Sequence, residues 1–343
     1  MNILQIIGIT FVKILIIFTV MMLTVSYLVY FERKISAWAQ NRLGPNRVGW
    51  FGLLQPFADV FKLLLKEDIV PTNAHQRIHA LAPIIALFVA FSTYAVIPFG
   101  PDITVFGIVV PLVVADINIG VLYILALTSI GVYAITLAGW SSGSKYSLLG
   151  GIRSSAQMIS YEISMGFSVG GVILLASSLR PAAIVAAQHG WMWNAILQPI
   201  GFITFLVSSF AETNRLPFDL PEAEPELVGG YHTEYSSMKF AGFFLAEYAN
   251  MIIASAMIVT LYLGGWQLPL IGRLGLSAGW LATIQVAGFL FKVACLLFFF
   301  IWVRWSIPRF RYDQLMSLGW KVMFPLSLIN IIWVAVLIMV FKL

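Results

Sequence analysis

The sequence has few charged residues and almost no cysteine. Only 10% of its 343 residues are charged, against about 25% in an ordinary soluble domain. Because 60% of the residues are hydrophobic and the mean hydropathy is +0.92, this shortage of charge excludes a water-soluble enzyme, a disordered chain and a nucleic-acid-binding protein. The single cysteine, Cys295, excludes a disulfide framework and any cysteine-ligated cluster held by this chain alone. The composition predicts a membrane protein with many spanning segments.

The motifs of nucleotide and metal sites are also missing. No glycine-rich phosphate loop appears, so the chain shows no sign of a bound nucleotide. All four histidines fall in predicted loops, so no span offers an axial haem ligand. His75 and His79 have helical i, i+4 spacing but no clear third ligand, so we expect no zinc site. We therefore expect no metal, flavin or iron–sulfur cluster in this chain; any redox centre would belong to a partner.

Eight stretches are long and apolar enough to cross a membrane, for which a helix needs about 20 residues. No period-2 barrel pattern appears, and lipid tolerates no unpaired backbone, so the spans must be helical. No internal repeat supports an inverted-repeat transporter. We expect residues 1–343 to form one all-α polytopic integral membrane domain. The predicted spans are residues 4–30, 80–99, 113–138, 156–178, 195–211, 239–263, 280–303 and 323–341.

Lysine and arginine are distributed unequally among the loops. The odd-numbered loops hold 15 of them and the even-numbered loops hold 2. Basic loops stay on the cytoplasmic side of a membrane, so the odd loops are predicted inside and both termini outside. The two long charged loops, 31–79 and 212–238, both fall on the inner side. The function is therefore expected at the cytoplasmic face.

The first inner loop, 31–79, contains an amphipathic helix. One stripe at i, i+3, i+4, i+7 and i+8 is apolar: Phe57, Val60, Phe61, Leu64 and Leu65. Asp59, Lys62 and Lys66 occupy the other face. Two interpretations remain open. The helix either lies on the lipid headgroups or forms the wall of a cavity for an amphiphile, with its charged face toward the polar head.

Ionisable residues lie within the predicted spans. A charge at mid-membrane costs on the order of 3 kcal/mol and is usually kept for a partner charge or a proton path. For Asp116 and Lys292, an ion pair that locks helices together, such as one between Lys292 and a glutamate, is a reasonable explanation. Glu162, Glu247 and Glu212 (at the inner end of the fifth span) outnumber the bases in the membrane. Unpaired buried carboxylic acids can exchange protons near neutral pH, so these three favour a proton relay.

The fifth loop, 212–238, is acidic and also apolar. Arg215 is its only internal base, and Pro217, Pro221 and Pro225 forbid a regular helix. In an extended segment, alternate side chains point the same way, so three glutamates would line up. The apolar neighbours argue against a loop that only meets water, and we expect a loop held in place by packing or by partner bases. Its further acids are Asp219, Glu222, Glu224, Glu226 and Glu234.

Seven short strings occur in this chain in the same order as in one known family. They are 31–34 (FERK), 44–49 (GPNRVG), 54–59 (LQPFAD), 211–215 (AETNR), 217–220 (PFDL), 246–248 (AEY) and 308–315 (PRFRYDQL). The sequence resembles the quinone-site membrane subunit of respiratory complex I, the proton-pumping NADH:quinone oxidoreductase, known as the H subunit or as subunit 1 in mitochondria. The resemblance runs from about residue 25 to about residue 330.

This resemblance implies a subunit of the bacterial inner membrane whose substrate is ubiquinone or menaquinone. Its implied partners are peripheral-arm quinone-site and iron–sulfur subunits, small membrane subunits and antiporter-like subunits. Because the resemblance implies that the electron donor and the proton donors lie largely in a neighbouring subunit, we assign no catalytic residue to this chain. Carried over by position, Arg33, Arg42, Phe57, Asp59, Lys62 and Arg304 match the quinone chamber. The acids that match the coupling funnel are Glu162, Glu212, Asp219, Glu222, Glu224, Glu226 and Glu247. Arg309 and Arg311 match a basic loop that contacts the peripheral arm.

Other functions are compatible with parts of this pattern. A homologous membrane subunit of an energy-converting hydrogenase would share the fold and several of the acids. A stand-alone transporter would carry its charges mid-span, whereas here the acids cluster toward the inner face. A purely structural anchor for a peripheral arm would explain the basic loops but would leave the buried glutamates without a reason.

Overall fold

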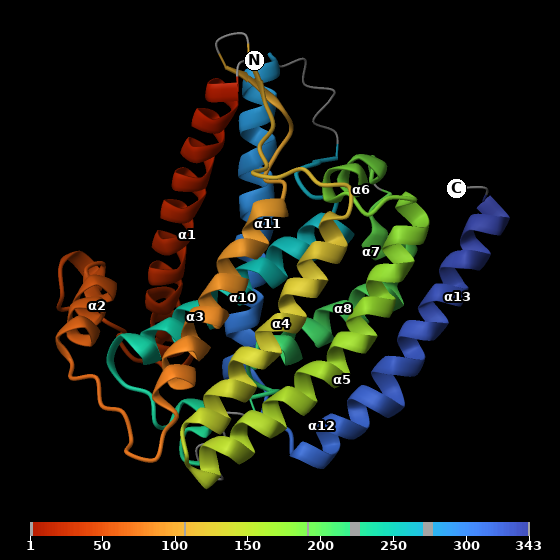
Figure 1. Ribbon diagram of the computed structural model, residues 1–343. Coiled ribbons are helices and arrows are strands. Elements are labelled where there is room, and N and C mark those ends of the chain that lie inside the picture. Colours follow the sequence, from red (N-terminus) through yellow and green to blue (C-terminus); the bar gives the residue numbers. More distant parts are fainter. Residues whose placement is uncertain (1–2, 106–107, 191, 220–226, 270–276, 342–343) are drawn as a thin grey trace.

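The computed structural model describes residues 3–105, 108–190, 192–219, 227–269 and 277–341, and the structural statements below refer to this part of the chain. Within it, eight helices lie at the eight predicted spans (Figure 1). They are α1 Ile3–Ala39, α3 Gln76–Thr93, α4 Gly120–Ser141, α5 Lys145–Ala176, α8 Pro199–Glu212, α10 Ser237–Tyr262, α11 Ala278–Ser306 and α13 Phe324–Phe341. Seven of these segments are long and apolar enough to cross a membrane. The prediction of an all-α polytopic membrane protein is confirmed.

The fifth predicted span is shorter than a membrane is thick. At 1.5 Å per residue, the 14 residues of α8 cover about 21 Å, against a hydrocarbon core of about 30 Å. The chain breaks at Gln198, between α7 (Asn194–Leu197) and Pro199. Asn330 of α13 accepts a hydrogen bond from the Gly201 N–H at 2.9 Å and donates one to the Gln198 side chain at 3.1 Å. A side chain from another helix thus satisfies a donor that the break leaves free.

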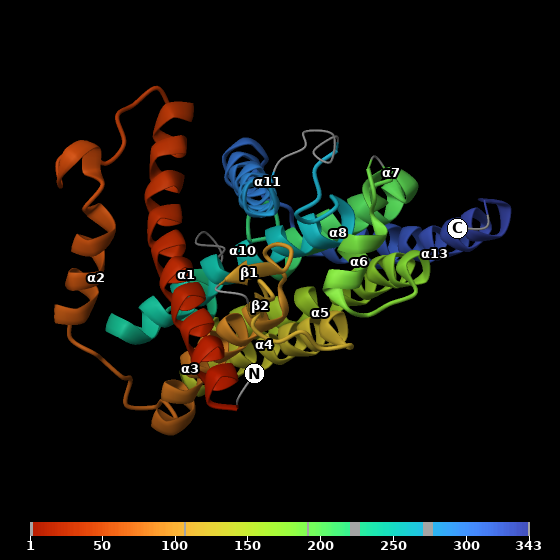
Figure 2. The same ribbon diagram turned by 90° about the horizontal axis from the view of Figure 1, so that it is seen from above.

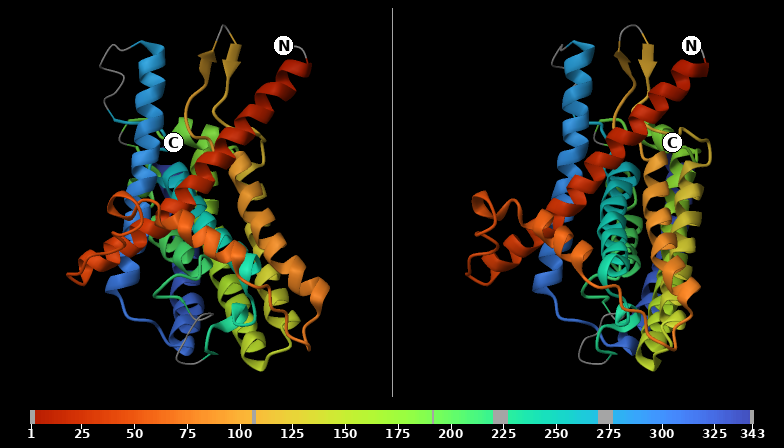
Figure 3. Two further views of the ribbon diagram at one scale, coloured as in Figure 1. Left: turned by 90° about the vertical axis from the view of Figure 1, so that its left-hand side faces the viewer. Right: turned by 60° about the vertical axis from the view of Figure 1, so that its left-hand side comes forward.

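Short elements connect the long helices. They are η1 Trp50–Gly52, α2 Gln55–Leu65, η2 Tyr94–Val96, β1 Ile103–Val105, β2 Ile108–Val110, α6 Pro181–Ala187, η3 Gly230–His232, α12 Tyr312–Leu318 and the π-helical turn η5 Gly319–Met323. The strands form one antiparallel pair in which Ile103 faces Val110. The helix α2 is the amphipathic helix expected in the first inner loop. It lies to one side of the bundle and contacts α1 and α10 (Figures 2 and 3).

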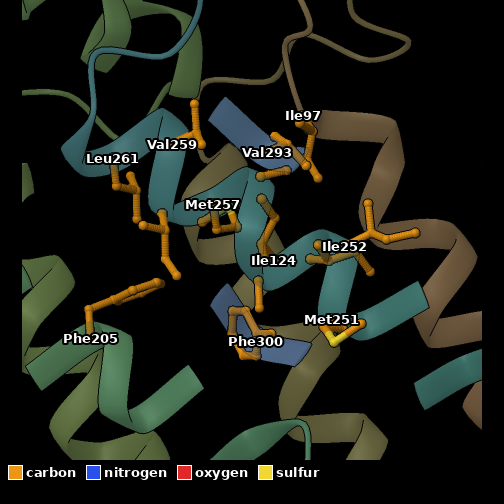
Figure 4. Packing of buried hydrophobic residues seen from close by; sticks show 14 of the residues in the cluster. Ile97, Ile124, Phe205, Met251, Ile252, Met257, Val259, Leu261, Val293 and Phe300 are labelled. Carbon is orange, nitrogen blue, oxygen red and sulfur yellow. The ribbon is translucent and has the colours of Figure 1, made fainter. Parts of the chain in front are cut away.

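The centre of the bundle is α10. Every residue from Met251 to Tyr262 is buried, as expected for a helix that is apolar or small on all faces. Side chains from α4, α8 and α11 pack around it, among them Ile124, Phe205 and Phe300 (Figure 4). The first half of α10, Ser237–Asn250, is less completely buried and carries the polar residues discussed below. The apolar half therefore fixes the position of the polar half.

Asp116 and Lys292, which were predicted to lie within spans, have partners that the sequence did not indicate. Asp116 precedes α4, which begins only at Gly120, and it pairs with Arg180, whose Nε lies 2.7 Å from its carboxylate. The expectation that Asp116 lies within a span is therefore wrong. Lys292 donates to the main-chain carbonyls of Leu263, Gly265 and Gln267 at 2.7–3.0 Å, instead of to the expected glutamate. These carbonyls follow the end of α10, where the helix dipole favours a cation.

Candidate functional site

A cluster of buried charges lies where α1, α10 and α11 approach the loop that follows α8. The helix α1 continues to Ala39, nine residues beyond the predicted span, and this extension carries Glu32. Glu32 is only 4% exposed. Its carboxylate accepts hydrogen bonds from Arg215 at 3.0 Å, from the Tyr248 hydroxyl at 2.7 Å and from Arg304. One carboxylate thus joins three separate segments of the chain.

Arg215 links this cluster to a second acid. Its Nε lies 2.6 Å from Oε1 of Glu247, and its guanidinium lies over the Tyr248 ring at 4.3 Å. Burial disfavours the Arg215 cation, but the carboxylates of Glu247 and Glu32 outweigh this effect and raise its pKa well above the usual value. A buried charge needs a partner of opposite sign, and here two arginines face two glutamates. We call Glu32, Arg215, Glu247, Tyr248 and Arg304 the charged cluster.

The loop that carries Arg215 is anchored from two sides. Gln157 of α5 donates to the carbonyls of Ala211 and Phe218, each at 2.8 Å. On the other side, Arg309 lies 2.9 Å from the buried carboxylate of Asp219. The structure therefore brings Asp219 and Arg309 together as an ion pair within the chain. Of the other acids predicted in this loop, Glu222, Glu224 and Glu226 lie outside the described residues, whereas Glu234 lies within them.

Two further acids lie deeper in the bundle. Glu162 of α5 accepts a hydrogen bond from Ser129 of α4. Glu212, the last residue of α8, interacts with the Thr128 hydroxyl and is close enough to Glu162 for the two carboxyl groups to influence each other. A cavity of about 50 Å³ lies between Glu212 and Glu247, and both acids line it. Three of the predicted acids are thus neighbours within the bundle.

A groove of about 400 Å³ lies between α1, α2 and α10. Its charged residues are Arg33, Asp59, Lys62 and Lys66, and Arg33 and Asp59 are 2.6 Å apart. Most of the remaining lining is apolar or aromatic: Val25, Val29, Pro56, Val60, Leu63, Phe240, Ala241, Phe244, Leu245 and Tyr248. The groove therefore combines a charged margin with a long apolar wall.

The other predicted residues lie elsewhere. Arg304 belongs to the charged cluster, while Arg42 is exposed and donates to Gln40. Phe57 is 43% exposed on α2 and is not among the residues that line the groove. Arg311 is exposed and pairs with Asp313 at 2.7 Å. Of the six residues matched to a chamber, the groove thus collects Arg33, Asp59 and Lys62.

Sequence reasoning gave Glu32, Arg215 and Tyr248 no role in the site. A signal for Glu32 was present, because Met21, Val25, Leu28 and Glu32 follow one another at spacings of four, three and four and are all buried. This spacing places Glu32 on the buried face of α1. The sequence interpretation ended the span at residue 30, where charges begin, and therefore assigned Glu32 to a loop.

A family model and several known proteins that are similar to this chain all point to the same protein family. A family model described as NADH dehydrogenase matches residues 12–335. The chain is 56% identical to NADH-quinone oxidoreductase subunit 8 of Rhodothermus marinus, over 94% of this chain and 95% of that protein. It is 52% identical to the NADH-quinone oxidoreductase H subunit of Salinibacter ruber, over 94% of this chain and 93% of that protein. It is 54% identical to the H subunit numbered 1 of Geobacter sulfurreducens, over 93% and 92%.

Proposed function

This chain belongs to the NADH dehydrogenase family of membrane subunits, and from that premise we propose that it forms part of the chamber in which quinone is reduced and couples that reduction to proton translocation. It is a multi-pass membrane protein and a subunit of an NADH-quinone oxidoreductase, and the other subunits of that complex are its partners. Because we expect no redox centre in this chain, the electrons come from a neighbouring subunit. The complex lies in the bacterial inner membrane, with both termini of this chain on the periplasmic side.

The groove between α1, α2 and α10 suits a quinone. A quinone has a polar headgroup on a long apolar tail, and the groove has a charged margin beside an apolar wall. Binding pockets for such molecules are mainly apolar with a few placed polar groups. In this proposal the tail lies along Val25, Val29 and Phe244, and the headgroup passes the margin formed by Arg33, Asp59 and Lys62.

The observation that carries the coupling proposal is a series of contacts from the groove to Glu247, which shares a cavity with Glu212 inside the bundle. Tyr248 lines the groove and donates to Glu32. Glu32 binds Arg215, and Arg215 binds Glu247. Glu247 in turn shares a cavity with Glu212, which interacts with Glu162. A change of charge at the groove can therefore act through these contacts on Glu247 and, across the cavity, on Glu212.

Quinone reduction changes the charge at the groove, and this change would act along that series of contacts. Reduction to quinol takes up two electrons and two protons, so negative charge builds transiently in the chamber. A nearby carboxylate responds by taking up or releasing a proton, and coupled acids titrate as a group. We further propose that the 217–238 loop moves with the state of the quinone and changes the protonation of Glu212 and Glu247. In this proposal Asp219, Glu222, Glu224 and Glu226 belong to the same proton-coupling group of acids.

In this proposal the basic loop before α12, which carries Arg309 and Arg311, contacts the partner subunits. Arg311 is exposed, with a side-chain exposure of 72%, so it is available to a peripheral subunit. Arg309 forms an ion pair with Asp219 and therefore links this basic loop to the 217–238 loop. We expect the peripheral-arm quinone-site and iron–sulfur subunits at this face. Small membrane subunits and antiporter-like subunits are expected beside the bundle.

Photoaffinity labelling tests the assignment of the groove. The assembled complex is irradiated with a photoreactive short-chain quinone, and labelled peptides are identified by mass spectrometry. We expect label on α1, on α2 or on the first half of α10, and protection by excess unmodified quinone. Val60→Trp, which fills the groove, should remove the label, whereas Phe61→Trp on the exposed side of α2 should retain it. Label confined to other segments, unaffected by Val60→Trp, would contradict the assignment.

A further inference from the structure

Two small cavities flank Glu212. The first, of about 50 Å³, also touches Glu247 and Asn214, and the second, of about 30 Å³, extends among apolar residues such as Phe205 and Met257. Four residues line both cavities: Thr128, Glu212, Thr213 and Asn250. Glu212 and these polar neighbours therefore stand at the boundary between a polar space and an apolar one.

The first cavity has the size and the polar groups that buried water requires. About 10–15 Å³ of such volume is enough for one water molecule, which needs two to four polar partners. The first cavity therefore has room for several waters, and carboxyl, amide and hydroxyl groups line it. The second cavity is smaller, and apart from Ser209 and the shared residues its lining is apolar.

Asn250 lines both cavities and takes no part in the contacts described above. It lies on α10 three residues after Glu247, so the two side chains share one face of the helix. No hydrogen bond joins its amide to another residue within the described ranges. An amide in a membrane helix is costly unless it is hydrogen-bonded. Because Asn250 lines the same cavity as Glu212 and Glu247, water in that cavity would supply the missing partner.

We propose that Asn250, with Thr128, binds water molecules through which a proton passes between Glu247 and Glu212. This inference rests on the proposed function. The O–H bond of protonated Glu247 breaks, its proton binds to the first water, and a different proton leaves the water chain for the Glu212 carboxylate. Arg215, 2.6 Å from Glu247, stabilises the Glu247 carboxylate that remains. Asn250 is thus a positioning residue, because it acts through the water that it orients.

Asn250→Leu tests this role, since leucine has a similar volume and no amide. In the assembled complex, reconstituted in proteoliposomes, quinone reduction coupled to pumping should slow by about tenfold or more, because positioned proton transfer contributes about 10²–10⁴-fold to a rate. The solvent deuterium isotope effect on that rate should increase, which a purely structural change would not cause. Asn250→Ser leaves a hydroxyl and more room for water, and it should restore most of the rate.

Ile253→Leu is the matched control, because Ile253 lies one turn further along α10 and lines only the second cavity. It should leave the rate and the isotope effect unchanged. A normal rate and isotope effect in Asn250→Leu would overturn the inference. If Glu247→Gln and Glu212→Gln lose pumping while Asn250→Leu retains it, only the role of Asn250 fails. If the two glutamine variants also pump normally, the proposed function fails as well.

A high-resolution cryo-EM map of the unaltered complex provides a test that does not depend on the folding of a variant. Ordered water density is expected within hydrogen-bonding distance of the Asn250 amide, between Glu247 and Glu212. A map that resolves these side chains and shows no water in the first cavity would overturn the inference.

Discussion

Glu32 and Arg33 are adjacent in the sequence but belong to two different regions of the molecule. A helix turns by about 100° per residue, so α1 directs them to different neighbours. Glu32 is 4% exposed in the charged cluster, whereas the Arg33 side chain is 47% exposed at the margin of the groove. Each is paired, but Glu32 has three partners from distant segments, while Arg33 forms its ion pair with Asp59 of the nearby helix α2.

The difference lies in what each pair contributes to stability. Removing one partner of a buried ion pair leaves an uncompensated charge and costs about 3–5 kcal/mol. An exposed pair contributes about 0–1 kcal/mol. The charged cluster is therefore expected to hold α1, α10 and α11 in a fixed arrangement, whereas the groove margin can change its contacts when a ligand enters.

Arg215→Leu should have the largest effect on stability. It leaves Glu32 with fewer partners and takes from Glu247 its ion pair, at a cost of about 3–5 kcal/mol. We expect little assembled complex in the membrane, measured by native gel electrophoresis and flavin content. Arg33→Leu is the control and should assemble normally. Equal assembly of the two variants would remove the distinction between cluster and groove.

Tyr248→Phe should have an intermediate effect, because it removes one hydrogen bond to a carboxylate and keeps the ring beneath Arg215. A hydrogen bond to a charged group contributes about 1.5–3 kcal/mol. The midpoint of thermal unfolding of the purified complex should fall, and the KM for quinone should rise because Tyr248 also lines the groove. A changed KM with an unchanged midpoint would place Tyr248 functionally in the groove alone.

Asp59→Asn should affect binding more than stability. It weakens the exposed pair with Arg33 by no more than about 1 kcal/mol, so the complex should assemble. We expect a several-fold higher KM for quinone with a similar kcat, the pattern of a lost binding contact. Steady-state kinetics over a range of quinone concentrations measures both. A reduced kcat at unchanged KM would instead assign Asp59 to the chemical or coupling step.

Arg311→Gln should have the smallest effect on the chain itself. Its pair with Asp313 is fully exposed, so the midpoint of thermal unfolding should not change measurably. A weaker attachment of the peripheral arm, measured by its loss from the complex at increasing salt, would support the docking assignment. Attachment that is as salt-resistant as in the unaltered complex would argue against it.

The spans and the amphipathic helix were predictable because both depend on local patterns. Hydropathy over about 20 residues identifies a span, and a period of 3.6 residues identifies α2. The length of α8 was less predictable. The main-chain N–H of Gly201, near the start of the helix, donates its hydrogen bond to Asn330, which lies 129 residues later in the sequence. The ion pair of Asp116, which precedes α4, likewise involves a residue that is distant in the sequence, Arg180.

Local sequence patterns could not predict the charged cluster either, because its members are far apart in the sequence. Glu32 finds Arg215 at a separation of 183 residues and Tyr248 at 216. Sequence reasoning could count acids and bases but could not pair them, so it left Glu247 without the arginine that lies 2.6 Å away. The carbonyl ligands of Lys292 were invisible too, because the main chain carries no sequence signal for accepting a cation.

The rates of quinone reduction and of proton pumping, measured together, test the central claim most directly. They are measured in proteoliposomes that contain the assembled complex with Glu247→Gln, and Asp59→Asn serves as a control whose two rates should return to normal at saturating quinone. The coupling account predicts that Glu247→Gln lowers both quinone reduction and proton pumping at saturating quinone, because the amide can neither carry the proton nor balance Arg215. Normal rates of quinone reduction and proton pumping in assembled Glu247→Gln complex would contradict it.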